Sequence, residues 1–321
     1  MHSFKDLSIL FAQHFDKSHF PSSPNNLYDP CNYFLQIGGK RIRPTLCLLG
    51  NELFDEIHID SYHIATAVEL FHNFTLVHDD MMDAASLRRG MQTVHTKYNS
   101  NIALLSGDVM LIKAYEYLNK IQPQYLQSIL QLFNKTAIEV CEGQQLDMDF
   151  ENQQEVSLAE YIKMIELKTS VLLAAALQMG AIIGGASEGN CNHLYQFGLN
   201  LGIAFQIQDD YLDAFGDPEK FGKEVGGDIK QNKKTFLLLH SLEVASSTQK
   251  EKLYQLMKEN PSNKVEQVLE IYNACNVQEW TKNLKQKYFD TALQHVEDIA
   301  VVSLRKKPLI ELAHYLIDRE H

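Results

Sequence analysis

The sequence predicts an all-α fold, a bundle of about ten or more helices forming a single domain over residues 1–321. Apolar residues recur at helical spacing in long segments. No proline lies between Pro44 and Pro123, or between Pro123 and Pro218, so little interrupts long helices in the centre of the chain. We find no alternating β-branched run bounded by tight-turn pairs, and therefore expect no sheet.

Three segments represent the predicted elements in chain order. Residues 64–83 and 161–185 have apolar spacing near the 3.6-residue period of a helix. Residues 241–263 are polar and predict a surface helix with its loop. Glycines are expected at the joints between helices, at Gly38, Gly39, Gly90, Gly184, Gly185, Gly216, Gly222, Gly226 and Gly227.

Composition excludes several classes of protein. Hydrophobic residues make up 45% and charged residues 22%, which is typical of globular proteins and not of disordered or fibrous ones. The net charge of −12 argues against a nucleic-acid partner, which would need a basic surface. Any cluster of lysines and arginines is therefore local.

The cysteine content and the apolar runs indicate the expected location of the protein in the cell. The five cysteines are scattered without a CxxC pair, which disfavours a disulfide framework or a zinc site and indicates a reducing compartment. The charged N-terminus is not typical of a signal peptide. The apolar run 171–184 contains Gln178 and is shorter than the roughly 20 residues of a membrane helix. We therefore expect a cytoplasmic protein with no integral membrane segment.

Two aspartate clusters share one internal spacing. HDDMMD contains Asp79, Asp80 and Asp83, and QDDYLD contains Asp209, Asp210 and Asp213. On a helix the first and last carboxylates of each cluster share a face, where their like charges require a cation. Carboxylate oxygens suit Mg²⁺, which also binds substrate phosphates. A lone DDxxD is more often a solvated helix face, but both clusters lie in apolar surroundings where unpaired charge is costly.

Basic residues occur in short runs elsewhere in this acidic chain. They are Lys40, Arg41 and Arg43 after Gly38-Gly39, the pair Arg88-Arg89, Lys168 beside Thr169, and Lys223, Lys230, Lys233 and Lys234. Each run alone is most often solvated surface, although arginine forks suit bidentate phosphate binding. With the aspartates they indicate metal-bridged diphosphates. Because no glycine-rich P-loop accompanies them, chemistry on a diphosphate ester is favoured over nucleotide hydrolysis.

The motifs together resemble those of the trans-isoprenyl diphosphate synthases over about residues 38–235. The matching segments, in order, are GGKRIRP, ELFHNFTLVHDDMMDAASLRRG, GQQLD, LKTS, FQIQDDYLD and FGKEVGGDIKQNKKT. The resemblance implies an all-α homodimer with the isoprenoid synthase fold and a deep cavity between its aspartate motifs. It also implies about three Mg²⁺ ions per active site and head-to-tail condensation of isopentenyl diphosphate with dimethylallyl, geranyl or farnesyl diphosphate.

The resemblance also implies individual roles. The metal ligands would be Asp79, Asp80, Asp83, Asp209, Asp210 and Asp213. The allylic diphosphate would contact Arg88, Lys168, Lys223 and Lys233, and the developing carbocation would be stabilised by Thr169 and Gln206. The isopentenyl diphosphate site would contain Lys40, Arg43, His72 and Arg89, although His72 could also be an ordinary core histidine. Gln144 and Asp147 resemble positions near the cavity.

One departure from the family pattern concerns the late lysine motif. Gln231-Asn232-Lys233 stands where the family usually has Glu-Gly-Lys, so the glycine is absent but the lysine is kept. The first aspartate motif is the shorter form, with two residues between Asp80 and Asp83.

Product length is expected to depend on the helix that precedes Asp79. Thr75 lies one turn below Asp79 and is small, whereas Phe71 lies two turns, or roughly 12 Å, below it. Phe74 occupies the position at which, in the family, a bulky residue limits elongation. Thr75 favours the twenty-carbon geranylgeranyl diphosphate, with the fifteen-carbon farnesyl diphosphate as the alternative.

Three other functions fit the motifs less well. An all-α histidine-aspartate metal phosphohydrolase would use His72, His78 and Asp79, but leaves the second cluster and the lysines unexplained. A terpene cyclase would need neither an isopentenyl site nor a repeated DDxxD. A regulatory subunit of a heteromeric synthase could dispense with the aspartates, yet all six are present.

Overall fold

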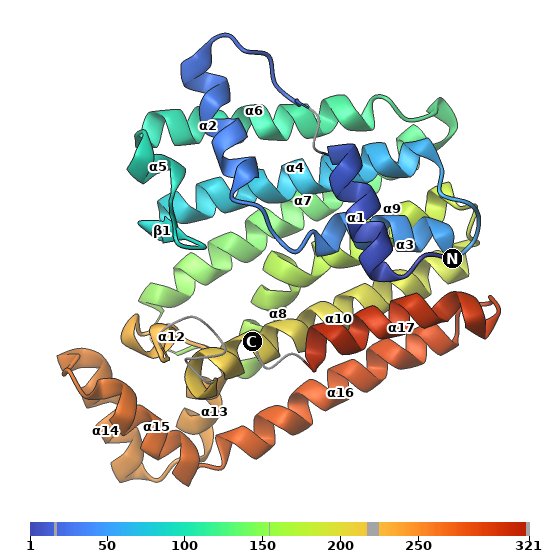
Figure 1. The fold of residues 1–321 in the computed structure, drawn as a ribbon. Helices are drawn as coiled ribbons and strands as arrows, with labels where there is room; N and C mark the ends of the chain where they lie inside the picture. The colour runs from blue at the N-terminus through green and yellow to red at the C-terminus, as the bar shows by residue number, and fades with distance from the viewer. Residues whose placement is uncertain (16–17, 154, 217–224, 319–321) are drawn as a thin grey trace. The chain divides into compact units, whose positions relative to one another are not determined.

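The computed structural model describes residues 1–15, 18–153, 155–216 and 225–318, which form an all-α structure as predicted (Figure 1). The chain forms two compact units, each assembled from three stretches of sequence. Unit 1 draws on Met1–Lys135, Ala175–Tyr195 and Ile299–Leu309, and unit 2 on Thr136–Ala174, Gln196–Asp298 and the chain from Ile310.

Unit 1 is organised around the helix that carries the first aspartate cluster. Its elements are α1 (Phe4–Phe15), α2 (Asn25–Gln36), α3 (Ile42–Glu52), α4 (Ile59–Met82), β1 (Leu87–Arg88), β2 (Met91–Gln92), α5 (Val94–Lys97) and α6 (Ser100–Leu118). The predicted helix 64–83 is α4, which begins earlier because His58 Nδ1 accepts a hydrogen bond from the Asp60 amide at 3.1 Å. Helix α4 packs along α6 (Figure 1), where Gly107 leaves room for the His78 ring; a Cβ there would lie 2.3 Å from His78 Nε2.

Unit 2 contains the second aspartate cluster. Its complete elements are α8 (Leu158–Ile165), the π-helical turn η1 (Glu166–Ser170), α12 (Gly227–Lys230), α13 (Phe236–Val244), α14 (Ser247–Glu259), α15 (Lys264–Ala274) and α16 (Val277–Glu297). The polar segment 241–263 contains the predicted surface helix as α14. Ser246 and Gln249 form a capping box at its start, and Asn260 ends it in the left-handed region with φ of 47°. The remaining helices of the chain are α7 (Pro123–Asn152), α9 (Val171–Ile183), α10 (Glu188–Phe215) and α17 (Ser303–Ile317).

One short β-hairpin departs from the prediction that the chain contains no sheet. β1 and β2 pair as a two-residue antiparallel hairpin whose turn residues, Arg89 and Gly90, have φ of 52° and 77°. Two positive φ values are typical of the type I′ turn that matches strand twist. A hairpin with such short arms lacks the alternating pattern from which strands are recognised.

The apolar run that begins at Val171 is part of a longer helical segment. Leu158–Ile183 is the one stretch of the described residues with the length and mean hydropathy (1.4) of a membrane span. Because 72% of its most apolar window is buried inside the protein, it equally has the properties of a core helix.

Candidate active site

The first aspartate cluster lies at the C-terminal end of α4. Asp80 is only 2% exposed and both of its carboxylate oxygens accept from Arg88 Nε at 2.9 Å. Arg88 Nη2 lies 2.8 Å from Asp80 Oδ1 and 3.6 Å from Asp79 Oδ2. Burial raises the pKa of the Asp80 carboxyl, and the hydrogen bonds from Arg88 oppose this. The Arg88 fork therefore anchors the buried aspartate, whereas Asp83, at the C-cap of α4, is exposed.

The hairpin explains how Arg88 reaches this position. Arg88 is the last residue of β1, and the Arg89-Gly90 turn reverses the chain immediately after it. The Thr93 hydroxyl secures the base of the hairpin by donating to the Ala85 carbonyl at 2.7 Å. The hairpin thus returns the Arg88 guanidinium to the end of α4.

Arg89 belongs to a second cluster of cations around His72. Arg43 Nη1 lies 3.0 Å from His72 Nε2, and a Cβ on Gly39 would lie 2.8 Å from Arg89 Nη1. The pKa of His72 is held well below its usual range, first by burial and then by the positive charge of Arg43. His72 is therefore neutral, and its Nε2 accepts from Arg43. The structure thus brings together Arg43, His72 and Arg89, as expected for an anion site.

The residues expected to limit product length form an aromatic cluster below Asp79. Phe71 is fully buried, and its ring lies 5.7 Å from that of Phe74 and 5.2 Å from that of Phe133. Phe74 is half-buried and packs edge-on against His78 at 4.8 Å. The Thr75 hydroxyl donates to the His72 carbonyl at 2.8 Å, so its polar end is satisfied within the helix. Phe133 had no signal in the sequence, because it lies far from the motif.

The second aspartate cluster, on α10 in unit 2, also has a buried middle residue. Asp210 is 5% exposed and accepts from the Tyr161 hydroxyl at 2.5 Å and from Gln206 Nε2 at 2.9 Å. Burial raises the pKa of Asp210 to about 7, and the nearby Asp228 carboxylate adds to this. Asp213 Oδ2 accepts from the Asp228 amide at 3.0 Å.

Lys168 and Thr169 lie in the π-helical turn η1. Lys168 Nζ donates to Asp147 Oδ2 at 2.6 Å, and the Thr169 hydroxyl donates to Gln206 Oε1 at 3.4 Å. Gly143 on α7 and Gly202 on α10 pack directly against this turn, since a Cβ on either would lie within 2.7 Å of its backbone. Single π turns occur frequently at functional sites. The predicted residues therefore form two groups joined by side-chain hydrogen bonds, Asp147 with Lys168 and Thr169 with Gln206 and Asp210, which meet at the adjacent residues Lys168 and Thr169.

The late lysine motif shows how asparagine replaces the family's glycine. Asn232 has φ of 59°, a left-handed conformation that asparagine tolerates better than most residues. Its side chain donates to the Met257 carbonyl at 3.2 Å and accepts from Lys264 at 2.5 Å. Lys233 lies 3.6 Å from Asp228. The predicted ligand Lys223 lies outside the described residues.

Both clusters suit the same kind of metal. In each, the middle aspartate is buried and held by side chains, whereas Asp79, Asp83, Asp209 and Asp213 are more accessible. These four supply carboxylate oxygens at helical i, i+4 spacing, the donor set that Mg²⁺ prefers. Imidazole, which suits zinc and other transition metals, has other partners here: His72 faces Arg43, and His78 Nε2 lies 3.1 Å from the Leu104 carbonyl. These contacts disfavour the phosphohydrolase alternative.

Three residues of the site are not among the sequence predictions, and one predicted residue has a buried polar atom without a partner. Tyr161, Asp228 and Glu69 were not predicted; Tyr161 precedes Lys168 by seven residues, or two helical turns, which is the only signal that could have indicated it. The Gln144 amide nitrogen is buried without a hydrogen-bond partner in the described part of the chain.

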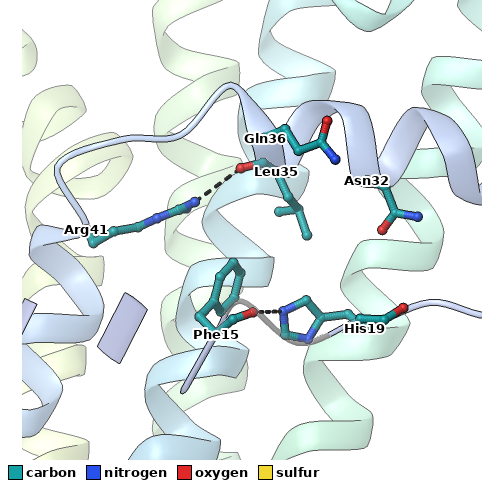
Figure 2. A pocket seen from close by; sticks show the side chains of 7 residues that line it. Phe15, His19, Asn32, Leu35, Gln36 and Arg41 are labelled. Carbon is teal, nitrogen blue, oxygen red and sulfur yellow. Dashed lines mark hydrogen bonds between the residues drawn. The ribbon is translucent and has the colours of Figure 1, made fainter. Parts of the chain in front are cut away.

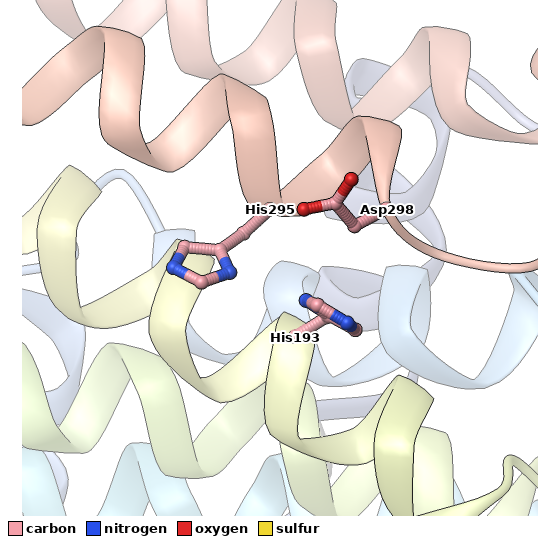
Figure 3. Close-up of side chains that lie close together, drawn as sticks. All are labelled: His193, His295 and Asp298. Carbon is pink, nitrogen blue, oxygen red and sulfur yellow. The ribbon is translucent and has the colours of Figure 1, made fainter.

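Outside these clusters, an imidazole and a carboxylate lie at the end of α16. Figure 3 shows His295 in its last turn and Asp298 just after it.

The chain is similar to known proteins over most of its length. The polyprenyl synthetase family model matches residues 24–275. The chain is 37% identical to a geranylgeranyl diphosphate synthase of Methanosarcina mazei, covering 93% of this chain and 91% of that protein. It is 39% identical to a geranylfarnesyl diphosphate synthase of Natronomonas pharaonis, over 68% of this chain and 69% of that one.

A solved structure is similar over the full length. The crystal structure of a geranylgeranyl pyrophosphate synthase is 43% identical, with a TM-score of 0.94 and complete coverage of both chains. The all-α isoprenoid synthase fold expected from the motifs is thereby confirmed.

Proposed function

The chain belongs to the polyprenyl synthetase family, and we propose that it condenses isopentenyl diphosphate head-to-tail with allylic diphosphates to give geranylgeranyl diphosphate. Dimethylallyl, geranyl and farnesyl diphosphate would serve as successive allylic substrates. We further propose that residues 1–321 act as one polyprenyl synthetase domain, since the family match runs through most of the chain.

The observation that carries this proposal is the proximity of the α4 carboxylates to cations from neighbouring elements. The end of α4 presents Asp79 and Asp80 beside the Arg88 fork, and two turns before Asp79, His72 lies against Arg43. Carboxylates that can bind a divalent cation therefore lie next to an arginine cluster that can bind an anion. A diphosphate ester, which carries both negative charge and metal-binding oxygens, suits such a surface.

The proposed metal ligands are the accessible aspartates of each cluster: Asp79, Asp83, Asp209 and Asp213. When bound, Mg²⁺ neutralises charge on the diphosphate leaving group and so lowers the barrier to ionisation. Asp80 and Asp210 would support their neighbours from buried positions, where Arg88 and Tyr161 hold them.

The protein's own residues would bind the substrates and stabilise charge. Arg88, Lys168 and Lys233 offer cations to the allylic diphosphate, with Arg43 and Arg89 binding isopentenyl diphosphate. The Thr169 hydroxyl and the Gln206 amide oxygen would face the developing allylic cation, which the isopentenyl double bond attacks. The proton that is then lost would pass to the departing diphosphate. Apolar side chains such as Phe71 and Phe74 would keep water from the cation.

We propose that the functional form is a homodimer in the cytoplasm. Leu104, Leu105 and Ile112 are exposed on α6, and Ile112 is 67% exposed. An apolar helix face of this kind is typical of a protein–protein contact. Ile112→Glu would convert the dimer to a monomer in light scattering, whereas a monomeric wild-type chain would refute this part of the proposal.

The deciding experiment is an assay of the isolated chain. Labelled isopentenyl diphosphate is incubated with Mg²⁺ and each allylic primer, and the dephosphorylated products are sized by chromatography. A twenty-carbon product supports the proposal, and a fifteen-carbon product would make the chain a farnesyl diphosphate synthase. No transfer with any primer would favour a regulatory subunit.

A further inference from the structure

A buried carboxylate on α4 has no place in the site described so far. Glu69 is 4% exposed and lies ten residues before Asp79. Its Oε1 accepts from Arg41 Nη1 and, at 3.1 Å, from Asn73 Nδ2. A buried carboxylate is costly unless it is paired, so the ion pair with Arg41 is needed wherever Glu69 is charged.

Arg41 is held in a strained conformation. It stands at the N-cap of α3 between Lys40 and Arg43, with φ of 51° in the left-handed region. A non-glycine residue is strained there and persists only where its surroundings fix it. Three contacts fix Arg41: Glu69, the Leu35 carbonyl at 3.2 Å from Nη2 (Figure 2), and the Phe15 ring 5.0 Å from the guanidinium carbon.

Glu69 also balances the other cations of this region. Burial lowers the pKa of Arg43 to about 10, and the negative charge of Glu69 acts in the opposite direction. The pKa of Arg89 is likewise lowered by burial and by Arg88, and Glu69 again opposes the change. The Glu69 carboxylate therefore pairs with Arg41 and acts to raise the pKa of both Arg43 and Arg89.

We propose that Glu69 is a positioning residue of the isopentenyl diphosphate site, which it serves by holding Arg41 and thereby setting the path of the chain from Lys40 to Arg43. The guanidinium of Arg41 donates to Glu69 and to the Leu35 carbonyl, so Arg41 anchors the loop from Lys40 to Arg43. The inference rests on the proposed function, because the ligand of that loop is taken to be isopentenyl diphosphate.

The direction in which neutralising Glu69 changes the affinity for diphosphate distinguishes a positioning role from a charge-balancing role. If Glu69 only offset the arginines, neutralising it would raise the positive potential and tighten diphosphate binding. If Glu69 positions the loop, the loss of its ion pair releases Arg41, and Lys40 and Arg43 shift with it. A displacement of about 1 Å in a binding group can cost about a hundredfold in function, so weaker binding should prevail.

The test is calorimetric titration of isopentenyl diphosphate, with Mg²⁺ and no allylic substrate, into the full-length chain. Glu69→Gln should raise the Kd for isopentenyl diphosphate at least tenfold, while the KM for the allylic diphosphate changes less than twofold. Glu69→Asp retains the charge but shortens the side chain by one methylene, and it should also weaken binding. Unchanged or tighter binding by both variants would overturn the inference.

Asp60→Asn is the matched control. Asp60 is also on α4 and is 3% exposed, but its carboxylate accepts from the Gln122 amide at 3.0 Å, away from the arginines. This variant should lower the melting temperature without weakening isopentenyl diphosphate binding; an equal loss in both variants would make the effect of Glu69 a general one and overturn the inference. Absence of prenyl transfer by the wild type would instead refute the proposed function, and titration with inorganic pyrophosphate would then test the Glu69 contact separately.

Discussion

Replacing Gly143 by alanine should disable the enzyme by moving the turn that carries Lys168 and Thr169. A Cβ at Gly143 would lie 2.2 Å from the Lys168 backbone nitrogen and 2.7 Å from its Cα. Ordinary contact begins at 3.4 Å, so α7 and the π turn must separate by about 1.2 Å. Because the obstacle is backbone, no side-chain rotation can relieve it.

The expected magnitudes follow from that displacement. Alanine in a helix interior is favoured over glycine by about 1 kcal/mol, whereas overpacking costs about 1–3 kcal/mol. Net destabilisation should therefore be modest, about 0–2 kcal/mol. Lys168 and Thr169 would nevertheless be displaced by about 1 Å, which is expected to reduce kcat about a hundredfold.

Steady-state prenyl transfer and thermal unfolding measure the two effects separately. Gly189→Ala is the control, since Gly189 also lies in a helix but has nothing within 4 Å of an added Cβ. It should retain full turnover and unfold at the same or a slightly higher temperature. Gly202→Ala, which crowds Ser170 from the other side of the turn, should behave like Gly143→Ala. A folded Gly143→Ala protein with normal kcat would refute the reasoning.

Three further predictions concern metal binding, product length and pH. Asp79→Ala or Asp209→Ala should reduce turnover at least a hundredfold at an unchanged melting temperature; normal turnover at saturating Mg²⁺ would contradict the metal assignment. Phe74→Ala should lengthen the product by one or more isoprene units, detected by chromatography, and adding Phe71→Ala should lengthen it further while costing about 3–5 kcal/mol of stability because Phe71 is fully buried; an identical product distribution in the double variant would exclude this role. His19 is neutral in the fold because burial lowers its pKa from 6.5 to about 4, so protonation of the unfolded chain should lower the free energy of unfolding by about 3 kcal/mol as pH falls from 7 to 4, and a His19→Gln variant with the same pH dependence would show that another group is responsible.

Much of this site follows from sequence because helices convert spacing into direction. The interval between Asp79 and Asp83 alone places two carboxylates on one face, and the apolar period of 64–83 identifies the helix that carries them. Arg43, His72 and Arg89 are different, because no local rule relates residues on three separate elements. Their proximity was expected only from the family resemblance.

Periodicity also fails where the backbone departs from the regular helix. Residues 161–185 have continuous apolar spacing, yet the helix widens into a π turn at Glu166–Ser170. Outside the segment, the glycines at 143 and 202 allow α7 and α10 to approach this turn closely, which the spacing within the segment does not indicate. Likewise, the turn at Arg89-Gly90 requires two positive φ values, and the residues around it carry no pattern that predicts them.

Sequence spacing alone does not distinguish the three aspartates of each cluster, but they differ in burial. The middle residue of an i, i+1, i+4 set points about 100° away from the first, so on α4 and α10 it turns into the protein. A carboxylate there needs donors, which Arg88 supplies to Asp80, and Tyr161 and Gln206 supply to Asp210. Since these donors occupy the oxygens of the buried pair, the outer aspartates are better placed to bind metal. Removing an outer aspartate should therefore impair metal binding alone, whereas removing a middle one leaves buried donors unpaired and impairs folding as well.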